Sequence, residues 1–135
     1  MLPLLNAIFA KFSADSALTA AFPGGLHRDR APEGTAMPYV VSRVIESAVE
    51  LSYGSRSRTH TRIKFSAFGV GHDAVGNLMQ TLIDHFDGAL LTLAGGATND
   101  SVTRVGDAVP TLHRQDAAGN DVWEWAVVFD YGVAS

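Results

Sequence analysis

Between residues 57 and 87 the hydrophobic period changes from two to about 3.6, and this change constrains the fold more than any other feature of the sequence. Residues 57–69 alternate strictly, which predicts a strand with a core face and a basic face. The core face carries Thr59, Thr61, Ile63, Phe65 and Ala67. Residues 73–87 predict an amphipathic helix that ends before Gly88, with the apolar stripe Val75, Leu78, Met79, Leu82, Ile83 and Phe86. Because each element is apolar on one side only, we expect the two to share a core.

The N-terminal residues predict another helix, broken in two. Its apolar stripe holds Leu4, Leu5, Ile8, Phe9 and Phe12, and Pro3 is acceptable in a first helical turn. Ser13 or Asp15 can cap a short continuation. That continuation stops at Pro23-Gly24-Gly25, because glycine and proline end helices.

The next segment predicts a strand, a loop and a second strand. Residues 26–30 form the short first strand and residues 31–37 the loop. The second strand begins at Pro38, since proline is tolerated at the first residue of a strand. Residues 47–56 predict a turn or a frayed strand end around Tyr53-Gly54.

The C-terminal residues predict a hairpin. One arm, residues 101–115, is irregular and is interrupted at Gly106 and Pro110. Residues 116–121 make the turn, and residues 122–133 form a second arm in which aromatic and aliphatic side chains alternate with polar ones. The order of helix, strands, helix and strands predicts an α+β fold, in which helices cover a mainly antiparallel sheet.

Composition limits the classes of function. The length suits one domain over residues 1–135, and a net charge of −4 offers no electrostatic case for sequence-specific binding of nucleic acid. Cysteine is absent, which excludes disulfides and thiolate metal sites and fits a reducing compartment. The N-terminus lacks the basic segment of a signal peptide, and no run approaches the roughly 20 apolar residues of a membrane span. We therefore expect a soluble protein with no membrane partner.

The sequence motifs that resemble catalytic or binding sites are weak. Residues 69–74, GVGHDA, fit a loose dinucleotide-binding pattern, but no following strand supplies the acidic residue for the ribose, so a tight turn into a helix is the better interpretation. The five histidines lack the spacing of a zinc site, and no serine lies in a nucleophile elbow. Asp84 and Asp87 share a helix face but flank the apolar stripe, so we expect them to be solvated. We expect no catalytic residue, metal or cofactor.

A row of basic residues is the most unusual charge feature. Its members are spaced by two along a strand and so lie on one face: Arg56, Arg58, His60, Arg62 and Lys64. One interpretation is a solvated face balanced by acidic residues such as Glu46, Glu50 or Glu124. The other is a contact with phosphates, a pore lining or a neighbouring subunit, of which a subunit is favoured by the overall acidity.

The layout of the chain resembles a known family. A short strand is followed by Ala31-Pro32-Glu33-Gly34 and then by Pro38-Tyr39-Val40-Val41, with an alternating strand, an amphipathic helix and a strand pair after them. This order resembles the tail completion or tail terminator proteins of long-tailed bacteriophages, small proteins that join tails to heads. The resemblance covers nearly the whole chain.

The resemblance implies a structural virion protein and not an enzyme. Such a protein, encoded by a phage or prophage, would cap the tail tube as a ring, typically of six copies, and present the surface that meets the head connector. Its partners would be itself, the tube protein and connector proteins, in the host cytoplasm during assembly and then in the virion, and DNA would pass through the lumen of the ring. The alternatives are a small cellular oligomeric binding module and a cofactor-binding enzyme.

Candidate contact regions follow from the same interpretation. They are the loop 31–37, the connector 94–101 and the basic row. We take as candidate interface residues Arg28, Arg30, Glu33, Arg56, Arg58, Arg62 and Lys64. Within the first strand, residues 28–30 are expected to alternate, so that both arginines share a face and Asp29 points away from them.

Overall fold

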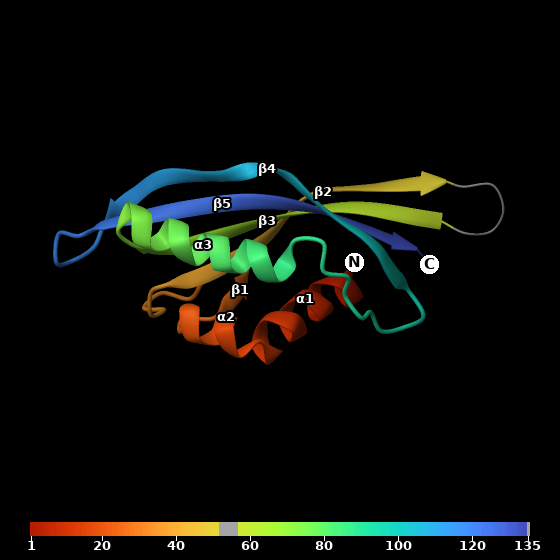
Figure 1. Ribbon diagram of the computed structural model, residues 1–135, viewed down its shortest axis with the longest axis horizontal. Coiled ribbons are helices and arrows are strands. Elements are labelled where there is room, and N and C mark those ends of the chain that lie inside the picture. The colour runs from red at the N-terminus through yellow and green to blue at the C-terminus, as the bar shows by residue number, and fades with distance from the viewer. Residues whose placement is uncertain (52–56, 135) are drawn as a thin grey trace.

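The computed structural model describes residues 1–51 and 57–134, and within them the chain forms a five-stranded sheet with three helices on one face (Figure 1). The elements are α1 (Leu2–Ala14), α2 (Ser16–Ala21), β1 (Leu26–Arg28), β2 (Tyr39–Leu51), β3 (Ser57–Val70), α3 (His72–Phe86), β4 (Thr98–Gln115) and β5 (Asp121–Ala134). The strand order is β1-β2-β3-β5-β4, antiparallel throughout except for the β1–β2 pair. The predicted α+β fold with a mainly antiparallel sheet is therefore confirmed.

Helix α3 matches the predicted amphipathic helix to within one residue at each end. It is preceded by Gly71, which has a φ of 91°, and is followed by Asp87 and by Gly88, which has a φ of 69°. Both glycines take a left-handed conformation that other residues avoid. Its stripe is buried as predicted, with Leu78 half-buried: the buried residues are Val75, Met79, Leu82, Ile83 and Phe86. No helix in the described part of the chain is long and apolar enough to cross a membrane.

Asp15 lies between the two N-terminal helices and caps the N-terminus of α2; it is one of the two residues predicted for this role. Its carboxylate accepts hydrogen bonds from the amides of Ala17 and Leu18 at 2.9 and 3.2 Å and lies 2.6 Å from Nδ1 of His85. Burial by itself would raise the pKa of Asp15. The Leu18 amide, the charge of His85 and the Ala17 amide together lower the pKa by more than burial raises it, so the net pKa lies below the ordinary value. The cap therefore also ties α2 to α3.

The predicted stripe of the first helix is wrong at Phe9. Leu4, Ile8 and Phe12 are buried, but Phe9 is 49% exposed. Successive helical residues turn by about 100°, so Phe9 lies that far around the helix from Ile8 and falls outside the buried face. Ala7 takes its place in the core.

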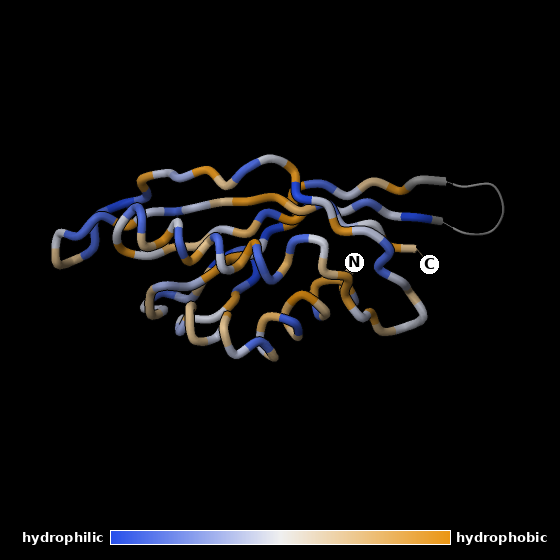
Figure 2. Tube along the Cα trace, viewed as in Figure 1, coloured by the Kyte–Doolittle hydropathy of each residue, from blue (hydrophilic) through white to orange (hydrophobic). Residues whose placement is uncertain are grey.

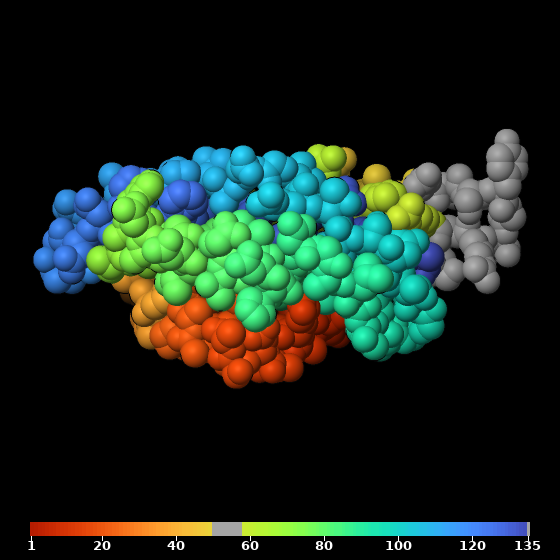
Figure 3. Space-filling model, in the orientation of Figure 1, coloured from red at the N-terminus to blue at the C-terminus, as the bar shows by residue number. Residues whose placement is uncertain are grey.

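The core lies between the helices and one face of the sheet. The predicted alternation of β3 is confirmed, because Thr61, Ile63, Phe65 and Ala67 are buried in turn. Phe65 lies between the rings of Phe86 and Phe129, at centroid distances of 5.3 and 5.8 Å. Figure 2 shows hydrophobic residues concentrated in α1 and the middle of the strands, and Figure 3 shows the face that α1, α2 and α3 cover.

The C-terminal hairpin is confirmed, with an earlier start. Strand β4 begins at Thr98, so the predicted connector 94–101 is part loop and part strand. Its register with β5 shifts between Val105 and Val109, at the predicted interruption by Gly106, whose φ is 79°. Such a bulge is a site where glycine is favoured. In the turn, hydrogen bonds led by the Asn120 amide lower the pKa of Asp116.

The expected alternation at residues 28–30 is wrong. Strand β1 ends at Arg28, and Asp29 has a φ of 62°, so the backbone leaves the sheet instead of continuing as a strand. Aspartate tolerates this left-handed conformation better than most residues. Residues 29–38 form the loop before β2, as expected for 31–37. Residues 47–51, predicted as part of a turn or frayed strand end, instead continue β2 in pairing with β3, and the rest of that segment, around Tyr53-Gly54, falls outside the described residues.

Candidate subunit and partner interface

The basic row lies on the face of β3 that points away from the helices, and carboxylates from the same chain balance it. The ion pairs are Arg58–Asp100 at 2.7 Å, His60–Asp130 at 3.0 Å, Arg62–Asp130 at 3.4 Å, Arg62–Glu46 at 3.8 Å and Lys64–Glu124 at 3.8 Å. Glu46 and Glu124 are two of the acidic residues named from the sequence; the side chain of Glu50 and the whole of Arg56 lie outside the described part. The antiparallel register explains the pairing, because β2 and β5 flank β3 on either side.

The side chain of Arg58 is fixed by hydrogen bonds as well as by its ion pair. One terminal nitrogen donates to Asp100 and, at 2.9 Å, to the hydroxyl of Ser101 on β4. A Cβ at Gly132 of β5 would overlap these groups, so the glycine makes room for the cluster. Arg58 therefore links β3 to β4 across β5, which is a structural role within one chain.

The structure separates the other candidate residues. Arg28 donates a hydrogen bond of 2.7 Å to the side-chain carbonyl of Asn6, which ties β1 to α1. Glu33 is exposed in the loop beside Gly34, whose φ is 81°. Arg30 is exposed and lines a pocket that Lys64 also lines. Of the candidates that the structure describes, only Arg30 and Lys64 line the same pocket.

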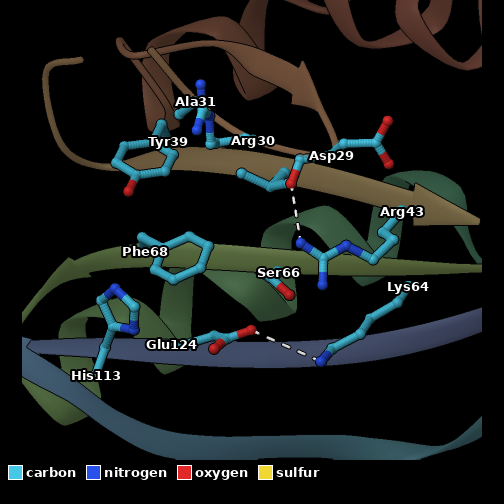
Figure 4. Close-up of a pocket in the computed structure, with 11 residues that line it drawn as sticks. Asp29, Arg30, Ala31, Tyr39, Arg43, Lys64, Ser66, Phe68, His113 and Glu124 are labelled. Atoms are coloured by element: carbon cyan, nitrogen blue, oxygen red, sulfur yellow. Dashed lines mark hydrogen bonds and ion pairs between the residues drawn. The ribbon is translucent and has the colours of Figure 1, made fainter. Parts of the chain in front are cut away.

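That pocket has a volume of about 370 Å³ and lies on the helix-free face of the sheet (Figure 4). Its walls come from residues 29–31 and from four strands: Tyr39, Val41 and Arg43 of β2, Lys64, Ser66 and Phe68 of β3, Glu124 of β5 and His113 of β4. A second hollow of about 310 Å³ adjoins it and shares Lys64 and Glu124. The helix-free face is therefore a broad groove across the strands.

Sequence reasoning selected only Arg30 and Lys64 of this pocket as interface residues, and it missed the other members, among them Tyr39, Arg43, Phe68 and His113. These four come from three strands that are distant in sequence, and only the pairing of Tyr39 with Phe68 and of Arg43 with Lys64 brings them together. The one signal in the sequence was their position on the non-core face of strands whose other face is apolar. That signal does not show which strands are neighbours.

Both edges of the sheet carry exposed aliphatic side chains. Strand β4 forms one edge, and its Val109 is 60% exposed. At the other edge β1 pairs only with Val40–Ser42, and among the described residues no strand covers β2 beyond that point, where Val49 is 66% exposed. Such edges have backbone groups and apolar side chains that a neighbouring chain can pair with.

The glycines at residues 69–74 have a packing role. Gly71 precedes α3, and its amide donates a hydrogen bond to the backbone carbonyl of Asp121. A Cβ at Gly69 would lie 2.9 Å from the side chain of Val75. The indole of Trp125 donates to the His72 carbonyl at 2.9 Å and closes the turn. Among residues 1–51 and 57–134, no three His, Cys, Asp or Glu side chains are placed to hold a metal ion.

Comparison with known proteins gives one family and one fold. A family model described as "Tail completion protein gp17" matches residues 6–121. Among solved structures, a chain from the "Virion of native gene transfer agent (GTA) particle" is similar with a TM-score of 0.72 and 18% identity, over 98% of this chain and 96% of that chain. At this identity the likeness shows a shared fold. No curated protein sequence matches this chain.

Proposed function

The chain belongs to the tail completion protein gp17 family, and from this membership we propose that it caps the tail tube as a ring and forms the surface that joins tail to head. The family supports a structural protein of a phage-like tail, and we propose no catalytic role for it. The match over residues 6–121, which includes most of α1, all of α2 and α3, and four of the five strands, is the observation that carries the proposal. A shared fold with a virion chain supports it.

The ring would form head to tail. In such a ring one surface of each copy meets a different surface of the next, so each copy needs two unlike contact surfaces. The two sheet edges supply them: β4 with Val109 at one side and β2 with Val49 at the other. We assign these edges to the contact between copies and expect six copies per ring.

The partners of the ring would be the tube protein below it and the connector proteins above it. The loop with Arg30 and Glu33 is exposed, and we assign it to these contacts together with Arg28. Arg58, Arg62 and Lys64 would contribute less, because their charges are already paired within the chain. DNA would cross the lumen without sequence-specific contacts, consistent with the net charge of −4.

Assembly in the cell tests the role. The gene would be deleted from the phage or prophage that encodes it and supplied from a plasmid, and particles would be counted by electron microscopy. Without the protein we expect separate heads and tails, and with it we expect joined particles in the host cytoplasm. Joined, infectious particles in the deletion strain would overturn the proposal.

Single substitutions test the sheet edges. Val49→Asp and Val109→Asp place a charge on the proposed contact edges, while Leu90→Asp does so in the loop after α3, where the leucine is equally exposed at 60%. We expect the edge variants to fold but to fail to form rings on tubes, and the Leu90 variant to assemble normally. Normal rings from both edge variants, or an equal defect in the control, would exclude these edges.

A further inference from the structure

Two cations face each other at the centre of the pocket on the helix-free face. Arg43 of β2 and Lys64 of β3 are direct cross-strand partners, an arrangement that is unfavourable for like charges. Lys64 has Glu124 at 3.8 Å, but Arg43 donates only to the backbone carbonyl of Asp29, at 3.0 Å. Within the described part of the chain, neither Arg43 nor the nearby Arg30 forms an ion pair.

Figure 4 shows how these groups lie. The Arg43 side chain extends from β2 and places its guanidinium near Ser66, and the Lys64 amine points toward Glu124 on β5. The Asp29 carboxylate points away from the aromatic side chains. Among the described residues, the Arg43 guanidinium therefore has unused donors and no carboxylate paired with it, because Glu124 lies against Lys64.

An apolar wall adjoins this charge. The rings of Tyr39 and Phe68 stack with centroids 5.1 Å apart and planes at 22°, and His113 meets Phe68 edge-on at 5.1 Å. Val41 and Ser66 lie buried on the same face. A peptide with an apolar side chain next to a carboxylate would find a partner for each group in one cavity of about 370 Å³.

We propose that this pocket binds an acidic peptide segment of a partner protein, with a carboxylate on Arg43 and an adjacent apolar side chain against Tyr39 and Phe68. The inference rests on the proposed function in one respect: the partner is one of the proteins that the completed tail brings to this subunit. Arginine favours carboxylates because its planar fork donates two parallel hydrogen bonds. Binding would also relieve the repulsion between Arg43 and Lys64.

The same features disfavour single-stranded nucleic acid. Base stacking needs an open aromatic face, but Tyr39 and Phe68 turn theirs toward each other. The ring of His27 lies 6.3 Å from that of Tyr39 and the ring of His113 lies 5.1 Å from that of Phe68, each at a steep angle. One carboxylate fits the available charge better than a run of phosphates.

A peptide titration on the isolated protein tests the proposal. The ¹⁵N-labelled protein would be titrated with acetyl-Phe-Asp-amide and with acetyl-Phe-Asn-amide, which has the same shape without the charge. We expect amide shifts centred on Tyr39, Arg43 and Phe68 and an affinity about tenfold higher for the Asp peptide, the value of one charge-assisted hydrogen bond. Shifts elsewhere, no shifts, or equal affinities would overturn the proposal.

Matched variants separate the pocket from general charge. Arg43→Gln should lower the affinity for the Asp peptide to that for the Asn peptide and leave the Asn peptide unchanged. Lys11→Gln removes a cation of α1 that lies over the ring of Phe86 and outside the pocket, so its affinities should equal those of the wild type. Amide spectra and melting temperatures like those of the wild type would show that both variants fold.

A short oligothymidylate provides the competing ligand. If it binds at the same residues and loses affinity with Arg43→Gln while the peptides do not bind, the pocket is a nucleic-acid site and the proposal fails. The titration is independent of tail assembly. Peptide binding by a protein that tails do not need would contradict the proposed function alone, and a needed protein without peptide binding would contradict this inference alone.

Discussion

Leu82→Ala tests the central packing of the fold. Leu82 is fully buried on α3, in the core between that helix and the sheet. The substitution removes about three carbon groups at about 0.8 kcal/mol each, and the cavity left behind adds a further term. We expect the free energy of unfolding to fall by about 3 to 4 kcal/mol, a large part of the roughly 5 to 15 kcal/mol typical of a domain.

Urea unfolding measures this loss. Trp123 and Trp125 lie half-buried on β5 and provide the fluorescence signal. Leu90→Ala is the matched control, because Leu90 is largely exposed and should change the free energy by less than about 0.5 kcal/mol. A loss below about 1 kcal/mol for Leu82→Ala, or one equal to the control, would refute the packing described for α3. Leu82→Asp would bury an unpaired charge and should prevent folding.

Three further substitutions probe the cap, a tight contact and the basic row. Asp15→Asn keeps the cap but removes a carboxylate whose pKa lies below 3.8. The wild type loses stability as the pH falls through that lowered pKa, because the carboxylate becomes protonated, and the variant should lose less stability over the same pH range. Thermal unfolding followed by circular dichroism at each pH measures the difference. Gly76→Ala should destabilise by about 1 kcal/mol despite better helix propensity, because its Cβ would lie 2.9 Å from the ring of Trp125; Trp125→Phe in the same chain should reduce the cost in a double-mutant cycle. Arg58→Glu with Arg62→Glu should lower the free energy of unfolding by about 1 to 2 kcal/mol, since each glutamate would face a carboxylate, and an unchanged urea midpoint would show that these pairs contribute nothing.

Local patterns in the sequence were enough to predict most elements. The spacing of apolar residues located α3 and β3, Asp15 was one of two predicted caps, and Gly106 marked the irregularity in β4. These features depend on residues within a few positions of one another, so a single sequence contains them in full. Phe9 was the exception, because periodicity shows that a helix has an apolar face but not where the buried part of that face ends.

The pocket could not be derived in this way. Arg30 was selected as part of the predicted first strand and Lys64 as a member of the basic row, yet the cavity also needs Arg43, Tyr39 and Phe68. Their proximity follows from the antiparallel register of β2 with β3, and a shift of one residue would place every side chain on the other face. The left-handed φ of Asp29, which ends β1 and turns Arg30 toward the pocket, has no sequence signature beyond the tolerance of aspartate for that conformation.

The sequence by itself therefore determined the periodic elements, their order and the α+β class, because these depend on local spacing. Only the tertiary structure decided that β5 lies between β3 and β4, and hence which charges meet. Strands that are distant in sequence pair through hydrogen bonds that any residue but proline can form, so composition does not specify the partner. Strand pairing brings carboxylates to Arg58, Arg62 and Lys64 and sets Arg43 opposite Lys64, where the described part of the chain gives Arg43 no ion pair.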